Sequence, residues 1–161
     1  MTPDALIRPA IVSERRLLEA LQTRASLSNP GDRDAILANP DAIELPIAQI
    51  VAGQVFVLEQ AGVIVAFAAI LPLTDGDTEL DALFVEPTAW RRGFGRMLID
   101  HCAQVARASG SSALRVIGNP HAEQFYVACE FNRGGTVETR FGIGYQFRRA
   151  LQQTADRIRS P

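Results

Sequence analysis

One segment of the chain reads as a β-strand that passes through a basic turn into an α-helix. The apolar strand residues 83–85 stop before Pro87, because proline has no N–H group to donate to a neighbouring strand. Apolar residues then recur at helical spacing over residues 97–105, and Gly110 follows where such a helix would end. A strand joined directly to an amphipathic helix needs a sheet on which that helix can pack, so this segment points to an α/β fold.

The turn between this strand and this helix is rich in arginine and glycine. The first backbone N–H groups of a helix have no intrahelical partner, and the helix dipole adds positive charge at the same point. Glycine there allows phosphate oxygens to approach the backbone without meeting a Cβ atom. We therefore predict an anion-binding turn made of Arg91, Arg92, Gly93, Phe94, Gly95 and Arg96. The alternative is an ordinary connection with solvated arginines, and the combination of strand, proline, arginines and helix favours the anion site.

The remaining sequence predicts one mixed fold. Apolar runs rich in β-branched and aromatic residues predict strands over residues 5–10, 55–58, 63–71, 78–85, 113–117, 131–138 and 143–150. Helical spacing predicts helices over residues 17–25, 35–37, 45–51 and 97–109 and after Asn119, with Ser13 as N-cap of the first. Several strands follow one another through short turns, so we expect a mostly antiparallel central sheet. We expect a single α/β domain of the α+β type over residues 1–161, with helices on both faces of the sheet.

The composition argues against several classes of protein. The 161 residues are 47% apolar and 21% charged, which are ordinary values for a globular chain. A net charge of −2 gives no basic excess for binding nucleic acid, and no apolar run reaches the roughly 20 residues that span a bilayer. Cys102 and Cys129 lie in no metal-ligand pattern, so we expect neither a metal site nor a disulfide framework. With no export signal visible, these features favour a cytoplasmic location.

A second informative segment reads N-P-H-A-E-Q-F-Y from Asn119 to Tyr126. Together with the arginine-glycine turn, it resembles the GNAT superfamily of acyl-coenzyme A dependent N-acetyltransferases, and the resemblance covers about residues 54–149. The turn is similar to the pyrophosphate-binding motif of that family, Q/R-x-x-G-x-G/A, and the second segment to its N-P-x-A-x-x-F-Y helix. The chain departs from the pattern at Trp90, where Gln or Arg is usual, and at Glu130, where glycine is common.

The resemblance implies a V-shaped split between the fourth and fifth strands, residues 78–85 and 113–117, into which acetyl-coenzyme A inserts as cosubstrate. It implies that the backbone of Leu83, Phe84 and Val85 lies beside the pantetheine arm and the thioester, whose oxygen gains charge during attack. It also implies cofactor contacts from Asn119 and Phe125. Tyr126 matches the residue that protonates the departing coenzyme A thiolate, and packing of its ring in the core is the alternative.

The catalytic base is a separate question, because Leu114 stands where some relatives carry a catalytic glutamate. Glu79 matches the glutamate that histone-type relatives use on the fourth strand. An amine arrives mostly as an ammonium ion, so a carboxylate within reach can take its proton before attack. Strand alternation predicts that Glu79, Asp81, Leu83 and Val85 share one face. Asp81 is the second candidate for the base, and a solvated Glu79 without a catalytic role is the alternative.

We expect an N-acetyltransferase that moves an acetyl group from acetyl-coenzyme A directly to a primary amine of a small molecule. The alternatives are acylation of a peptide or protein amine, and a non-catalytic acyl-coenzyme A sensor, which would need the arginine turn but neither acid nor base. A homodimer is expected on family grounds alone. Acceptor pockets in the family lie near residues 13–51 and 73–78, where Asp34, Asp41 and Glu44 would attract a cationic amine or are simply solvated.

Overall fold

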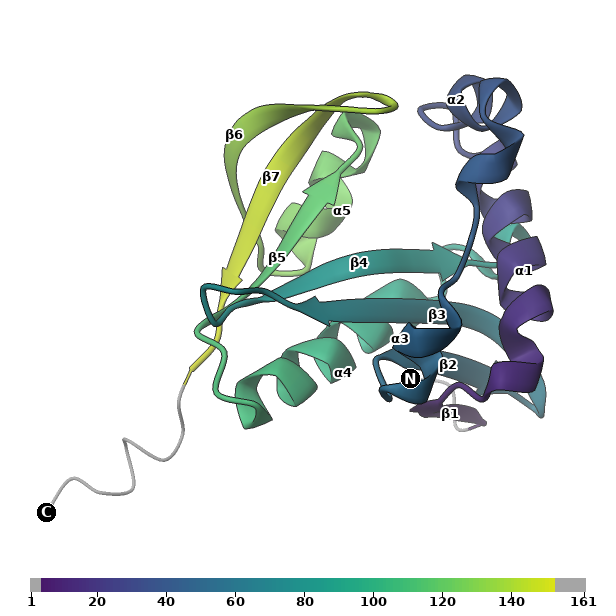
Figure 1. Cartoon of the computed structure of the whole chain (residues 1–161), viewed down its shortest axis with the longest axis horizontal. Coiled ribbons are helices and arrows are strands. Elements are labelled where there is room, and N and C mark those ends of the chain that lie inside the picture. The colour runs from purple at the N-terminus through teal and green to yellow at the C-terminus, as the bar shows by residue number, and fades with distance from the viewer. Residues whose placement is uncertain (1–3, 153–161) are drawn as a thin grey trace, which may run out of the picture.

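The computed structural model describes residues 4–152 and places their strands in one sheet with helices on both faces (Figure 1). The strands are β1 (Ala5–Pro9), β2 (Val55–Gln60), β3 (Val63–Pro72), β4 (Thr78–Val85), β5 (Ala113–Gly118), β6 (Asn132–Thr139) and β7 (Gly142–Ala150). The helices are α1 (Arg15–Ser28), α2 (Arg33–Ala38), α3 (Ile47–Val51), α4 (Phe94–Ala108) and α5 (Glu123–Ala128), with short 3-10 turns between elements. The strand order is β1-β2-β3-β4-β5-β7-β6, and the predicted single α/β fold is confirmed.

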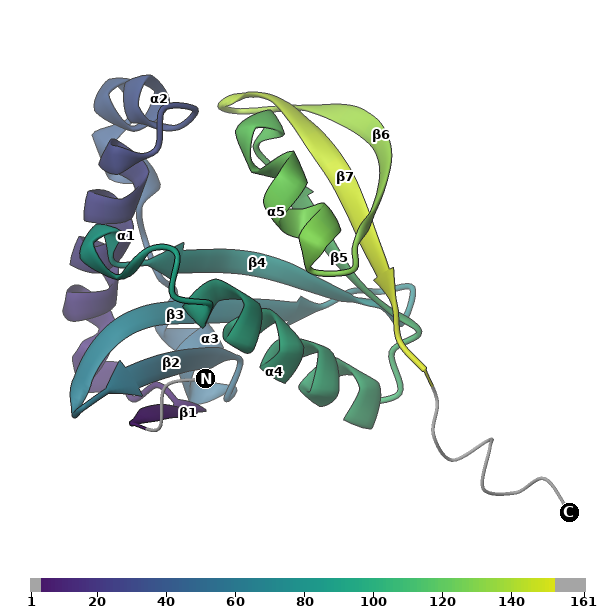
Figure 2. The ribbon, with the colours of Figure 1, turned by 180° about the vertical axis from the view of Figure 1, so that it is seen from behind.

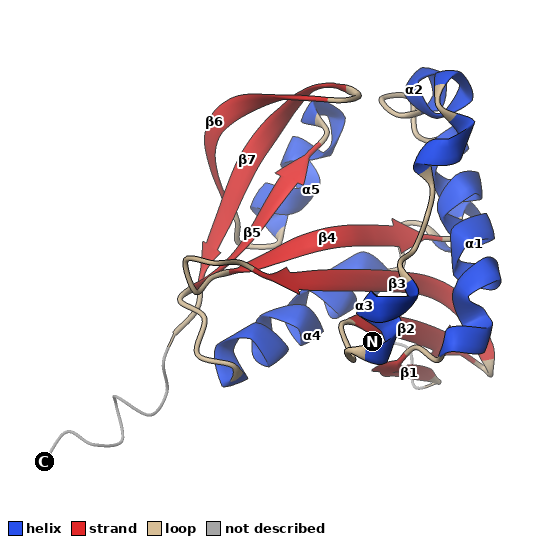
Figure 3. Cartoon of the chain, viewed as in Figure 1, coloured by secondary structure: helices blue, strands red, loops and turns tan. Residues whose placement is uncertain are grey.

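The sheet opens into a V between β4 and β5, as Figure 3 shows. These two strands are parallel and pair at two positions, Thr78 with Leu114 and Glu79 with Arg115. Beyond Glu79, β4 continues antiparallel to β3, while β5 turns away with β7 as its antiparallel partner. The predicted split between the fourth and fifth strands is therefore present, and it leaves one edge of β4 without a neighbouring strand.

Two apolar cores lie on opposite faces of the sheet. One packs α4 and α5 against β2 to β5 and β7, with Leu98, Cys102 and Phe147 fully buried in it. The other packs α1 and α3 against β2 and β3, with Leu18 and Leu21 fully buried in it. Figure 2, seen from behind, shows α4 and α5 together in front of the sheet, with α1 on the far side of it. Helices thus cover both faces, as the sequence predicts.

A β-bulge in the middle of β4 changes which side chains share a face. The register with β3 shifts so that Leu80 pairs with Ile70 and Ala82 pairs with Ala69, which leaves Asp81 as the extra residue. Leu80, Leu83 and Val85 belong to the core on the α4 side, whereas Asp81 contacts Gln49 of α3 on the other side. The prediction that Glu79 and Asp81 share a face with Leu83 and Val85 is wrong, because the inserted residue reverses the alternation.

The start of α1 also differs from the prediction. Ser13 lies within a 3-10 turn (Val12–Glu14) and does not cap α1 with its side chain. The carboxylate of Glu14 instead accepts a hydrogen bond of 2.9 Å from the N–H group of Ile11 and is held by Arg8 of β1. In residues 4–152 no helix is long and apolar enough to cross a membrane. The last residues of the predicted polar tail, 153–161, lie outside the described residues.

Candidate active site

A cavity of about 1070 Å³ lies in the split of the sheet. Its walls come from the unpaired edge of β4, the turn before α4, the end of β5, α5, the C-terminal half of α1, the start of α2 and the β6–β7 turn. Residues as far apart in sequence as Gln22 and Ile143 line it. The two sequence segments singled out above therefore lie on one cavity, because the topology brings the ends of β4 and β5 together.

The edge of β4 provides a row of backbone groups along this cavity. Leu83, Phe84 and Val85, which the resemblance places beside the pantetheine arm, all line it. Their backbone groups on the β3 side are paired with that strand, and the register with β5 stops at Glu79. The other side of the β4 edge thus offers N–H and C=O groups to an extended ligand, in the way that one strand adds to another.

The turn before α4 presents unpaired backbone donors to the same cavity. Among the described residues, no hydrogen bond is donated by the backbone N–H groups of residues 91–96. Gly93 has φ +83° and a Cβ built on it would meet nothing within 4 Å, and Arg91 has φ +66°. Trp90, at the departure from the family pattern, donates its indole N–H to the carbonyl of Val85 at 2.8 Å. That bond ties the turn to the end of β4, so Trp90 positions the turn.

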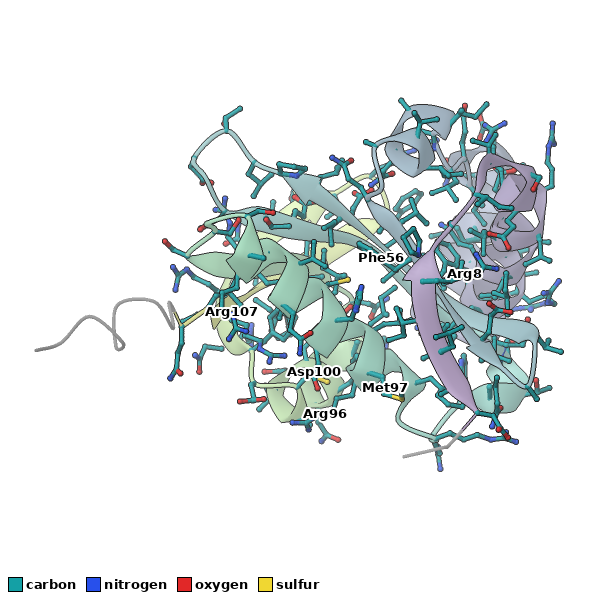
Figure 4. All side chains as sticks on the ribbon, turned by 90° about the horizontal axis from the view of Figure 1, so that it is seen from below. Arg8, Phe56, Arg96, Met97, Asp100 and Arg107 are labelled. Atoms are coloured by element: carbon teal, nitrogen blue, oxygen red, sulfur yellow. The ribbon has the colours of Figure 1, made fainter. Side chains whose placement is uncertain are left out.

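The three arginines of the turn lie in different environments. Arg91 and Arg96 line the cavity, whereas Arg92 lies outside its lining and donates to Gln60 at 3.4 Å. Arg96 donates to the backbone carbonyl of Ala128 at 2.8 Å, and Figure 4 shows it on the side of α4 that faces this segment. Arg91 therefore has the freest guanidinium on the cavity wall, and Arg96 also joins α4 to the end of α5.

Phe125 joins the two sequence segments directly. A Cβ built on Gly95, in the first turn of α4, would lie 3.0 Å from the Cζ atom of Phe125 and 3.8 Å from a methyl group of Val85. The absence of a side chain at position 95 is thus what allows α4, α5 and β4 to meet. Phe125 is 39% exposed and is one of the residues that line the cavity.

Tyr126 is buried in an aromatic cluster and also lines the cavity. Its ring packs on Phe125, Phe131 and Phe147, with ring centroids 5.1 to 5.6 Å apart. The residue is only 9% exposed, and within residues 4–152 no hydrogen bond is made by its hydroxyl. Burial, with smaller contributions from Cys129 and Asp32, raises the pKa of Tyr126 above its usual range. The phenol therefore stays protonated at neutral pH and keeps a proton to donate.

Asn119 is hydrogen-bonded to Asp32, a residue that the sequence patterns did not single out. Its Nδ2 donates to a carboxylate oxygen of Asp32 at 2.9 Å, and its Oδ1 accepts from the N–H group of His121 at 2.9 Å. Asp32 lies in the loop between α1 and α2, next to Gly31, where a Cβ would collide with the Asn119 side chain at 2.2 Å. The close approach of Gly31 to Asn119 places the Asp32 carboxylate on the cavity wall. A Gly-Asp pair after a helix is common in loops, so the sequence carried no specific signal for it.

The two candidate bases line different cavities. Asp81 lines the main cavity, and its carboxylate lies 3.4 Å from the Nε2 atom of Gln49. Glu79 lines a second cavity of about 460 Å³, and both cavities share Val116 and Ile117. Burial, and then the charge of Asp81, raise the pKa of Glu79, while Arg115 opposes the shift. The structure thus places Asp81 on the cavity directly and Glu79 beside it.

The free edge of β4 and the unpaired donors at the start of α4 together define a site for an extended ligand with an anionic end. Comparison with protein families identifies the class. The chain matches the acetyltransferase (GNAT) family over residues 18–131, and it belongs to that family of acyltransferases. A search of curated proteins finds no significant match.

Solved structures share the fold at low sequence identity. The PaiA N-acetyltransferase from Thermoplasma acidophilum, in complex with coenzyme A, aligns with a TM-score of 0.75 at 13% identity, over 91% of this chain and 99% of that one. A GCN5-related N-acetyltransferase from Rhodopseudomonas palustris aligns with a TM-score of 0.72 at 22% identity, over 94% of this chain and 98% of that one. The yncA protein from Salmonella typhimurium, a putative acetyltransferase with acetyl-coenzyme A, aligns with a TM-score of 0.67 at 20% identity, over 92% of this chain and 94% of that one.

Proposed function

We propose that this acetyltransferase moves an acetyl group from acetyl-coenzyme A directly to the primary amine of a small molecule. One observation carries the proposal: a single cavity joins the unpaired edge of β4 to the unpaired N–H groups at the start of α4. An extended thioester with a pyrophosphate matches both, since its amides would pair with the strand edge and its phosphates with the helix start. The coenzyme A complexes of fold neighbours agree with this assignment.

The residues around the cavity fit the cosubstrate. Gly93, Phe94, Gly95 and the Arg91 guanidinium would hold the pyrophosphate, and the backbone of residues 83–85 would hold the pantetheine arm. Phe125 and Asn119 would border it from α5 and the end of β5. We keep Arg92 and Arg96 as weaker electrostatic contributors, because Arg92 lies off the cavity and Arg96 is bonded to Ala128.

Acetyl-coenzyme A supplies an activated acetyl group, and the protein's own residues position it and move protons. A backbone N–H group on the β4 edge stabilises the carbonyl oxygen as it gains negative charge. The amine nitrogen bonds to the acyl carbon, the carbon–sulfur bond breaks, and the Tyr126 hydroxyl donates its proton to the leaving sulfur. Tyr126 is suited to this role because it is protonated, buried and without another partner for its hydroxyl in the described part of the chain.

A carboxylate takes the proton that the ammonium group must lose before attack. We now favour Asp81 over Glu79 for this step, because Asp81 lines the main cavity and Glu79 lines its neighbour. The raised pKa of Glu79 makes its carboxylate a stronger base than an ordinary glutamate, so relay of the proton through water keeps it as a competing candidate. The two carboxylates lie on the sheet face opposite Leu83 and Val85, so amine and cosubstrate can approach β4 from opposite sides.

Contacts across the open end of the split support a small acceptor over a peptide. The Asp32–Asn119 hydrogen bond crosses from the α1–α2 loop to the end of β5. Arg140 of the β6–β7 turn lies 3.9 Å from Asp41, which follows α2. An extended peptide that entered at this end of the split would meet these contacts, whereas a small amine needs only the volume of the cavity itself.

The test is an amine panel in which released coenzyme A is measured with a thiol reagent, combined with calorimetry of coenzyme A binding. We expect micromolar binding of coenzyme A and acetyl transfer to at least one small primary amine. Transfer to peptide amines alone would refute the small-molecule assignment. Binding of coenzyme A without transfer to any amine would instead support the sensor alternative.

A further inference from the structure

The end of the cavity that faces α2 and the β6–β7 turn differs in chemistry from the end at α4. The two arms of the V come close to each other there, as Figure 1 shows. Its apolar lining comes from both arms and consists of Ala35, Ile36, Ile117, Phe141 and Ile143. Phe141 and Ile143 are 45% and 60% exposed although they are large and apolar. Such side chains on opposite walls are suited to holding the apolar body of a small ligand.

The charges that line the cavity are separated by sign. Its arginines, Arg91 and Arg96, belong to the turn before α4. Away from that turn, the charged side chains in the described lining are Asp32 and Asp81, and no lysine or arginine lines that part. Arg140, the nearest cation of the β6–β7 turn, lies outside the lining, beside Asp41.

Asp32 lies close to the group that we propose as the acid. Asp32 accepts a hydrogen bond from the Asn119 side chain at 2.9 Å, and a Cβ on the adjacent Gly118 would lie 2.7 Å from the Tyr126 ring. The charge of Asp32 is also one of the smaller causes that raise the pKa of Tyr126. The Tyr126 hydroxyl has no hydrogen-bond partner within the described chain, and Tyr126, which is only 9% exposed, is one of the residues that line the cavity. An ammonium group held by Asp32 would therefore lie beside the point where the thioester sulfur leaves.

We infer that the acceptor is a primary amine on an apolar body and that it carries no carboxylate, with Asp32 holding its ammonium group. This inference rests on the proposed function and specifies its substrate class. An amino acid would bring its carboxylate into a part of the cavity whose described lining holds two carboxylates and no lysine or arginine. A buried anion without a partner is strongly disfavoured, so amino acids should be excluded while the matching amines are accepted.

The experiment compares phenethylamine with phenylalanine, and isoamylamine with leucine, because each pair differs by the carboxylate alone. We expect kcat/KM for each amine to exceed that for its amino acid by about 100-fold or more. Asp32→Asn keeps an oxygen that can accept from Asn119, and it should raise KM for phenethylamine about tenfold or more. It should also abolish the increase in melting temperature that phenethylamine gives in the presence of coenzyme A.

A second variant tests the charge argument in the opposite direction. Ile36→Lys places a cation in the part that lacks one, and it should shift the kcat/KM ratio toward phenylalanine. Equal or better use of the amino acids by the wild type would overturn the inference, as would an Asp32→Asn variant with unchanged KM. Transfer to none of the four compounds, while coenzyme A still binds, would overturn it too. Failure to bind coenzyme A would refute the proposed function itself.

Discussion

Gly118 at the end of β5 gives the sharpest test of how the aromatic cluster positions Tyr126. A Cβ at this position would lie 2.7 Å from the Cε2 atom of Tyr126 and 3.1 Å from the Cε2 atom of Phe147. Ordinary contact begins near 3.4 Å, so Gly118→Ala must displace the tyrosine ring by about 0.7 Å. Phe131 lies on another side of the ring, with centroids 5.6 Å apart, so the ring has little free space to enter.

Overpacking of this size costs about 1–3 kcal/mol of stability, which lowers the melting temperature by roughly 2–12 °C in a chain of this length. Misplacement by close to 1 Å costs up to about 10²-fold in rate, so we expect kcat to fall about tenfold or more. Gly135→Ala is the matched control, because its Cβ would meet only the flexible end of Gln146, at 3.3 Å.

Thermal melts, calorimetry with coenzyme A and turnover with the best amine measure the three effects separately. We expect coenzyme A affinity within a few fold of the wild type, because Gly118 lies away from the turn before α4. In a Tyr126→Phe background, Gly118→Ala should cause little further loss of kcat, since the hydroxyl it misplaces is already gone. Wild-type turnover in Gly118→Ala, or fully additive losses in the double variant, would refute this reasoning.

Three further predictions concern single side chains. Tyr126→Phe should lower kcat about 10²-fold and leave coenzyme A affinity within a few fold; unchanged turnover where chemistry is rate-limiting would reduce Tyr126 to a packing residue. Asp81→Asn should depress kcat/KM more than Glu79→Gln, and most at low pH where little free amine exists; a loss that is equal at every pH would indicate substrate binding instead. Arg24 donates to Glu86 at 2.7 and 2.8 Å and lowers its pKa. That pair therefore stabilises the fold above about pH 4.5, and the stabilisation is lost as the pH falls and Glu86 is protonated. Arg24→Met should lower the free energy of unfolding by at most about 1 kcal/mol at pH 7 and by less at pH 3, as measured by denaturant melts. A difference between the variant and the wild type that is the same at both pH values would contradict this.

The mostly antiparallel sheet and the split between its fourth and fifth strands could be predicted because local patterns and two family motifs agreed. The stop at Pro87, the helix after the glycines and the N-P start of the last helical segment all follow from residue types that restrict the backbone. The structure confirms each of these elements, with bounds that differ by a few residues. The contact of Phe125 with Gly95 was not predicted, although both residues belong to the matched motifs, because it depends on how α5 packs against α4.

The face of β4 could not be predicted, because the bulge at Asp81 depends on pairing with β3 rather than on the local sequence. Strict alternation grouped Glu79 with Leu83, and one inserted residue reversed that grouping. Asp32 was missed for a related reason: its place on the cavity depends on a hydrogen bond to Asn119, 87 positions away in sequence. Ser13 failed as a cap because the chain starts the helix with a 3-10 turn stabilised by Glu14.

The central claim, that the start of α4 binds the phosphates of coenzyme A, is tested most directly by calorimetry on two matched variants. Gly93 and Gly110 lie at opposite ends of α4, with φ of +83° and +91°, and neither would place a Cβ within 4 Å of another residue. Valine at either position strains the backbone in the same way, but only valine at 93 projects where phosphate must approach. We predict micromolar binding of coenzyme A to the wild type and to Gly110→Val, with a loss of about tenfold or more in Gly93→Val. Equal affinities in all three proteins, or no binding to the folded wild type, would contradict the account.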